Sequence, residues 1–313
     1  MKFFEFNRKG IFFTFAAIAL AAVIILSSKV YKIYEMKEDI DVIATRITTM
    51  NSFIKDVEQD LEKGLLIASS RAFLSMDQHI SNNGTYITSL EDSFRDLILN
   101  GKLYSSEPSL MKDSTFTDWT NKIETQANKI DIIVNFTIID VEINQTDPWH
   151  VSVDSLINFT VVDKKNTSKW TRNKNIIAMV SIENFEDPLY VVKTNGKATN
   201  SIAMAPTTDF VSGSDISNLL THINNSYYIE SETAPNFLMR LEGDLSNSST
   251  GIESMVNSQE LLEQGVSIKD RSAVDYIYFG TQSTFNYRIN GTPSWFKLDN
   301  SHLETYEVQN MTI

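Results

Sequence analysis

The feature that most constrains this chain is an unbroken apolar run close to its N-terminus. Nineteen consecutive residues between Lys9 and Lys29 carry no charge, and most of them are Ile, Leu, Val, Ala or Phe. As a helix that rises about 1.5 Å per residue, the run is about 28 Å long, close to the thickness of the hydrocarbon core of a bilayer. We therefore expect a transmembrane helix over residues 11–28, preceded by a basic leader or cytoplasmic tail at 1–10.

The apolar run has the length of a retained anchor. A secretory signal has a shorter apolar core followed by a small-x-small cleavage site, and no such site follows here. Neither Gly nor Pro occurs from Ile11 to Lys63. The helix is therefore expected to continue beyond the span for about 53 residues in all, or about 80 Å.

The junction between the basic segment and the apolar run reads Arg8-Lys9-Gly10-Ile11. It resembles the class III signal peptide of type IV pilins and archaeal pilin-like surface proteins, in which a short basic leader is cut after the Gly. The resemblance is confined mainly to residues 7–28. It implies processing by a prepilin-type peptidase, with the mature chain beginning at Ile11, and other pilin-like subunits or a second copy of the chain as partners. Phe15 stands where the family usually carries Glu, which helps subunits align in a filament, so polymerisation is left open.

A plain, unprocessed signal anchor explains the same residues. Lys and Arg near a span favour the cytoplasmic side, but three of them lie on each side here: Lys2, Arg8 and Lys9 before it, and Lys29, Lys32 and Lys37 after it. Long domains are translocated largely regardless of their charge. Under either alternative we expect a single-pass protein of the cell membrane with its body outside the cell.

An apolar seam follows the span, in the region 29–81. Its residues recur at alternating steps of three and four, the heptad spacing of a helix packed along one face. Charged residues lie between them and suit a solvated face. Packing against the chain's own head, as the pilin resemblance implies, or against a second copy in a parallel coiled coil would bury this seam, and we favour the head. The seam residues are Ile33, Met36, Ile40, Ile43, Ile47, Met50, Ile54, Val57 and Leu61.

The body is predicted to begin with helices and continue with strands. The region 82–130 holds two expected short helices, at 88–100 and 114–129. The region 131–195 is rich in β-branched residues that partly alternate with polar ones, as in half-buried strands. Short turns separate three expected strands, so we predict an antiparallel meander with strands at 132–143, 156–162 and 175–182.

The remaining region, 196–313, mixes both kinds of segment. We expect helices at 215–222 and 258–264 and strands at 237–243, 273–280 and 285–289. The predicted fold class is therefore α+β: a long N-terminal transmembrane and amphipathic helix packed on an antiparallel β-sheet head, with an α+β C-terminal extension. A long helix on such a sheet is also similar to the heads of pilin-like proteins.

Composition favours an outside location for the body. The net charge of −13 argues against nucleic acid, which needs a clustered basic face, and the absence of Cys excludes disulfides and thiolate metal sites. Asn-x-Ser/Thr sequences are more frequent than the composition alone predicts, and they mark candidate N-glycosylation sites on secreted surfaces. The nine asparagines are Asn83, Asn135, Asn144, Asn158, Asn166, Asn224, Asn247, Asn290 and Asn310.

The sequence predicts no catalytic residues, no cofactor and no metal site. No two of the four His stand four residues apart, and the Gly-x-Ser-x-Gly, Gly-x-x-x-x-Gly-Lys-Ser/Thr and Gly-x-Gly-x-x-Gly motifs do not occur. The polar turn at 163–168 lacks the glycine and the terminal acidic residue of a calcium loop. A carbohydrate-binding strip of aromatic side chains stays open as an alternative, from Trp149, Trp170, Trp295, Tyr227, Tyr228, Tyr276 and Tyr278.

These observations lead to one functional hypothesis with two alternatives. The first is a membrane-anchored, extracellular, pilin-like surface protein that acts in assembly or adhesion, without catalysis. The second is an unprocessed, signal-anchored ectodomain on a coiled-coil stalk, serving as a receptor or envelope protein. The third is a surface carbohydrate-binding module or enzyme in the C-terminal region.

Overall fold

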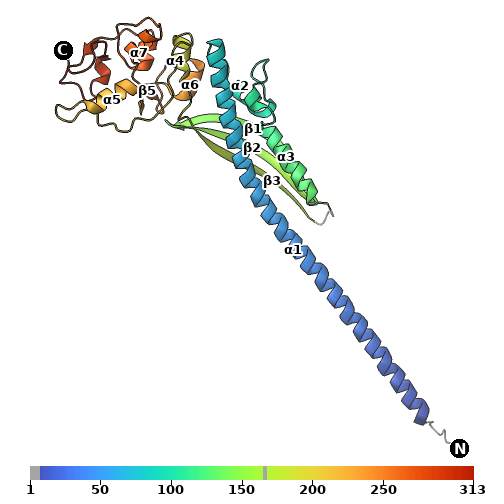
Figure 1. Cartoon of the computed structure of the whole chain (residues 1–313). Coiled ribbons are helices and arrows are strands. Elements are labelled where there is room, and N and C mark those ends of the chain that lie inside the picture. The colour runs from blue at the N-terminus through green and yellow to red at the C-terminus, as the bar shows by residue number, and fades with distance from the viewer. Residues whose placement is uncertain (1–7, 165–167) are drawn as a thin grey trace, which may run out of the picture.

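The computed structural model describes residues 8–164 and 168–313 (Figure 1). The chain is α+β, as predicted, with a long N-terminal helix and antiparallel sheets. Helix α1 projects far beyond the rest of the molecule, and the other elements gather around its C-terminal half (Figure 1).

Helix α1 runs without interruption over Arg8–Asn83, which is 76 residues and about 114 Å. It passes through Gly64, a residue that usually weakens a helix. The reason is the close approach of Trp119 on α3 (Phe116–Lys129), because a Cβ at position 64 would lie 2.4 Å from the Trp119 ring. The helix ends where Gly84 takes a positive φ of 66° and donates its N–H to the Ile80 carbonyl.

Three long strands form the predicted meander. They are β1 (Ile132–Asp147), β2 (His150–Asp163) and β3 (Lys169–Ser181), paired antiparallel in the order β1-β2-β3. Each strand is longer than the sequence predicted, and the turn expected at 144–148 is reduced to Pro148 and Trp149 between Asp147 and His150. One face of the sheet is covered by α1, α3 and α2 (Leu90–Asn100), and the other face is open to solvent.

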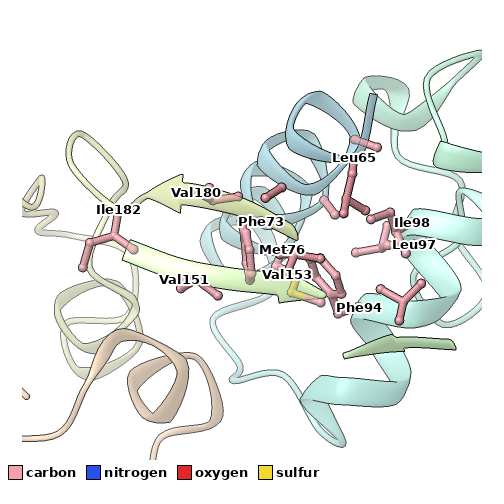
Figure 2. Packing of buried hydrophobic residues seen from close by; sticks show 14 of the residues in the cluster. Leu65, Phe73, Met76, Phe94, Leu97, Ile98, Val151, Val153, Val180 and Ile182 are labelled. Atoms are coloured by element: carbon pink, nitrogen blue, oxygen red, sulfur yellow. The ribbon is translucent and has the colours of Figure 1, made fainter. Parts of the chain in front are cut away.

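The main core lies between α1, α2 and the sheet. Figure 2 shows Phe73 and Met76 of α1 lying between Phe94 of α2 and the strand that carries Val153. The rings of Phe73 and Phe94 are tilted with their centroids 4.8 Å apart, a favourable aromatic geometry. Large apolar side chains from three separate elements therefore fix the upper half of α1 against the sheet.

The C-terminal extension consists of short elements around a second core. Its helices are α4 (Pro188–Lys193), α5 (Ser217–Asn225), α6 (Phe237–Glu242), α7 (Ser258–Glu263) and α8 (Asp275–Phe279). The short strands pair as β4 (Tyr228–Glu230) with β5 (Ile252–Ser254) and β6 (Asn286–Arg288) with β7 (Lys297–Asp299). Two 3-10 helices, Ser109–Met111 and Asn300–His302, complete the described elements.

Two strand predictions in this extension are wrong. The segment predicted as a strand at 237–243 is helix α6, because Asn236 caps its N-terminus by accepting the Met239 N–H and Gly243 ends it at a φ of 76°. The segment predicted as a strand at 273–280 contains helix α8, whose five residues are all buried. A short segment that is buried on every side has no polar face, so its sequence does not reveal a helical period.

We predict that Gly64→Ala destabilises the protein although Ala favours helices. Ala gains about 1 kcal/mol of helix propensity, but overpacking against Trp119 costs about 1–3 kcal/mol. Thermal unfolding of the purified full-length chain should show a lower midpoint. In the background of Trp119→Ala, which removes the clash, the same Gly64→Ala substitution should no longer lower the midpoint. A higher midpoint for the single variant would mean that Trp119 moves aside without cost.

Candidate functional site

The N-terminal half of α1 is the candidate functional site. Within the described residues, Ala17–Tyr34 is long and apolar enough to cross a membrane, and a signal sequence near an N-terminus would have the same character. It overlaps the predicted span at 11–28 and reaches a little further. The predicted processing residues Arg8, Lys9, Gly10 and Ile11 lie in the first turns of α1.

The apolar seam is half bare and half buried. Ile33, Met36, Ile40, Ile43 and Ile47 are 41–64% exposed, whereas Met50, Ile54, Val57 and Leu61 are at most 9% exposed. The change occurs within one turn, where the end of the sheet meets the helix. The head therefore covers the upper seam, from Met50 to Leu61. The lower seam, from Ile33 to Ile47, is left uncovered by the chain itself.

An ion pair fixes the point at which α1 leaves the head. Arg46 donates from Nη2 to Asp163 Oδ1 at 2.5 Å and from Nε to the same oxygen at 3.0 Å. It also donates to the Asp131 carbonyl at 3.3 Å. The hydrogen bond with Asp163 raises the pKa of Arg46, so the guanidinium stays charged. The lower end of the sheet is thus held to one turn of the helix.

A second contact with opposite charges lies higher on α1. Glu58 accepts from Arg172 at 2.7 Å and from Lys174 at 3.2 Å, and both partners lie on β3. Partial burial raises the pKa of Glu58, but the hydrogen bonds from Lys174 and Arg172 outweigh it and lower the pKa overall. These two contacts position the head on one side of the helix.

An open groove runs along α1 beside this junction. A cavity of about 780 Å³ is lined by Val42, Thr49 and Ile130, among others, and a second of about 500 Å³ lies between α1 and α3. Ile130 lines both cavities and is 53% exposed. Most of the surface lining the two cavities is apolar. The groove therefore lies beside the bare seam on α1 and extends upward along the head.

The charged residues inside the C-terminal extension form a buried network. Arg240 of α6 donates to Asp187 at 2.6 Å and to Asp275 at 2.9 Å, and all three side chains are fully buried. Tyr228 donates to Asp187, and Ser254 donates to Asp275. Full burial leaves no approach for a substrate. The network instead joins α4, α6, α8 and the β4–β5 pair.

A second buried network surrounds His302. Its Nδ1 lies 2.8 Å from Asp299 Oδ1, and its Nε2 lies 3.1 Å from the Tyr276 hydroxyl. Nε2 also lies 3.3 Å from Glu253 Oε2, which is an ionic contact without hydrogen-bonding geometry. Desolvation lowers the pKa of His302, but the hydrogen bond with Asp299 and the negative charges of Asp299 and Glu253 outweigh it and raise the pKa to about 10. The imidazole is therefore a structural cation at neutral pH.

Other predicted binding residues are dispersed. Tyr228 is buried in the main core and Tyr276 and Tyr278 in the core of the extension, so they do not form an exposed aromatic strip with the Trp residues. In the described part of the chain, no group of three or more His, Cys, Asp or Glu is placed to hold a metal ion. Residues 165–167 of the polar turn lie outside the described residues.

Seven of the predicted glycosylation asparagines are exposed. Asn158 is half-buried and donates its amide to Asn173 across the sheet. Asn166 lies outside the described residues. Exposure therefore permits modification at seven positions: Asn83, Asn135, Asn144, Asn224, Asn247, Asn290 and Asn310.

Comparison of the chain with protein-family models, with curated proteins and with solved structures finds no match. The strongest geometric fact is the seam that passes from buried to bare within one turn of a single helix.

We predict that the protein loses stability as pH rises from about 6.5 to 10. Folding raises the pKa of His302, so the folded state binds this proton more tightly than the unfolded state does. The resulting contribution to the free energy of unfolding is complete below about pH 6.5 and is lost as the pH rises to about 10. Thermal midpoints measured across this range should fall more steeply for the native protein than for His302→Gln. Equal slopes would mean that His302 is neutral in the folded protein.

Proposed function

We propose that this protein is a membrane-anchored, pilin-like surface protein whose head lies outside the cell and acts in assembly or adhesion, without catalysis. The observation that carries the proposal is the bare lower seam of α1. Support also comes from the leader-like junction at residues 8–11 and from the packing of the upper helix on an antiparallel sheet.

Lipid is poorly suited to bury the lower seam. Met36 to Ile47 is about 16 Å of helix that follows the candidate span, and charged residues such as Lys37 and Asp41 lie between its apolar positions. Each buried Ile or Met side chain contributes about 1.5–3 kcal/mol relative to an exposed one. Four such side chains in water, those of Met36, Ile40, Ile43 and Ile47, favour association with another protein, which supports an assembling subunit.

The position of the head argues against a symmetric coiled-coil stalk. The seam drifts by only about 20° per heptad along a straight helix, so the head and the bare seam lie on roughly the same side of α1. Two parallel copies paired in register through this seam would each place a head on the shared axis. Like charges at Lys32 and Lys37 would also face each other across such a dimer.

A partner displaced along the helix axis avoids both conflicts. Its apolar helix can cover the lower seam below the head, or lie in the groove formed by Val42, Thr49 and Ile130. Amphipathic helices commonly bind in apolar grooves of this kind. Offset packing is what an assembly of pilin-like subunits requires, and it favours this function over an independent ectodomain.

The N-terminal residue of the mature protein from native membranes tests the proposal directly. Mass spectrometry should find a chain that begins at Ile11, and Gly10→Val should leave the leader attached because a branched side chain replaces the residue before the cleaved bond. A mature start at Met1 or Lys2 would support the alternative, an unprocessed signal-anchored ectodomain.

We predict that Ile40→Glu disrupts assembly without weakening the head. Ile40 is 60% exposed and contacts none of the core, so the thermal midpoint should be unchanged. Placing a carboxylate in an apolar interface costs well over 1.4 kcal/mol, so association should weaken at least about tenfold. Ile268→Glu is the matched control, since Ile268 is an exposed apolar residue (48%) in the C-terminal extension.

The measurement is the size of the complex extracted in mild detergent from native membranes. Ile268→Glu should give the same complex as the native chain, and Ile40→Glu should give a smaller species. If both variants keep the native size, the lower seam is not an assembly surface.

A further inference from the structure

Two polar cavities in the head are each bordered by an asparagine of an Asn-x-Ser/Thr sequence. The first, of about 240 Å³, lies between α5 and α7 and includes Asn224 in its wall. The second, of about 350 Å³, lies between α2, the end of β1 and α6 and includes Asn144. The two cavities beside the middle of α1 have mostly apolar walls and border none of these asparagines.

We propose that Asn144 and Asn224 carry N-linked glycans whose first sugar occupies the adjoining cavity. The inference rests on the proposed location of the head outside the cell. It selects two positions among the candidate glycosylation sites and assigns a binding site to each sugar.

The walls of both cavities are suited to the hydroxyl and amide groups of a sugar. Asn257, Glu260 and Gln264 border the cavity beside Asn224. Glu91, Asp92 and Glu242 border the one beside Asn144, and their carboxylates are hydrogen-bond acceptors for hydroxyl groups. Each cavity is close to the lower limit of ordinary ligand pockets, a size that suits a single sugar ring.

The acceptor nitrogens are available. Asn144 and Asn224 are exposed, and neither side-chain amide forms a hydrogen bond with the described residues. Asn158, by contrast, donates its amide to Asn173, and the Asn83 amide lies 3.1 Å from His79. Exposed, unpaired amides are accessible for modification, and those beside a cavity place the sugar next to its wall.

Because the sugar is attached covalently, weak contacts with the cavity wall are sufficient to hold it there. The modification transfers a glycosyl group from a polyprenyl-phosphate-linked sugar supplied by the host. The bond from the anomeric carbon to the phosphate oxygen breaks, a bond from that carbon to Asn Nδ2 forms, the amide loses one proton, and the phosphate leaves with the electron pair. The tethered sugar then has a high effective concentration at the cavity, so a few hydrogen bonds hold it there.

Glycopeptide mass spectrometry of the protein from its native membranes is the first test. Sugar should be attached at Asn144 and Asn224. Unmodified asparagines at both positions would overturn the proposal, whatever is found elsewhere. Protease digestion of intact cells reports separately on the location of the head: a digested head with both asparagines unmodified contradicts only this inference, whereas a protected head contradicts the proposed location as well.

Thermal unfolding then tests whether the sugars occupy the cavities. Asn144→Gln and Asn224→Gln should each lower the midpoint by about 2–4 °C, while Asn83→Gln and Asn310→Gln, which border neither cavity, should not. The same variants made in a host without N-glycosylation should all match their parent, which separates the loss of the sugar from the effect of Gln. Equal midpoints for all four variants from native membranes would show that the glycans do not use the cavities.

Discussion

A single helix in this protein has to satisfy three surroundings in turn, and the rest of the structure depends on how it does so. The segment Ala17–Tyr34 is apolar apart from Lys29 and Lys32 near its C-terminal end, and it is long enough to cross a membrane. From Met50 upward one stripe is buried against the sheet. Between them, the bare seam is too apolar for water and too closely flanked by charge for lipid. That middle segment is the surface that we propose a protein partner covers.

The two cores of the body are joined by charge rather than by apolar packing alone. Arg240 of α6, a helix whose Phe237 and Leu241 pack in the main core, contacts Asp187 at the N-terminus of α4 and Asp275 of α8. Removing one member of such a buried group leaves an unpaired charge and costs about 3–5 kcal/mol. The network therefore makes the arrangement of the short helices specific, because other packings would leave at least one of these charges without a partner.

The sequence predicted the parts of the fold that have a clear period. Helix α1 and the three strands of the meander follow from the spacing of apolar residues over long stretches. Helices α6 and α8 were wrongly predicted as strands because they are short and largely buried. The contacts of Arg240 could not be predicted, since its partners lie 53 and 35 residues away. An Arg among Phe237, Leu238, Met239 and Leu241 was the one available signal of a buried ion pair.

The same limit applies to the candidate site. The heptad spacing predicted the seam, but the point where burial stops depends on the contact of Arg46 with Asp163, 117 residues away. Periodicity shows that a face is apolar, whereas what covers that face is decided by distant parts of the chain.

The unbroken helix also has a mechanical consequence. No Pro interrupts α1, and its single Gly above the span is packed against Trp119, so the rod lacks a hinge between Tyr34 and Asn83. Over that distance, about 73 Å, a tilt of about 10° about Tyr34 displaces the top of the helix by about 13 Å. The helix thus acts as a lever: a pull on the head is transmitted as torque to the segment Ala17–Tyr34, and a small rotation of that segment becomes a large movement at the far end of the helix.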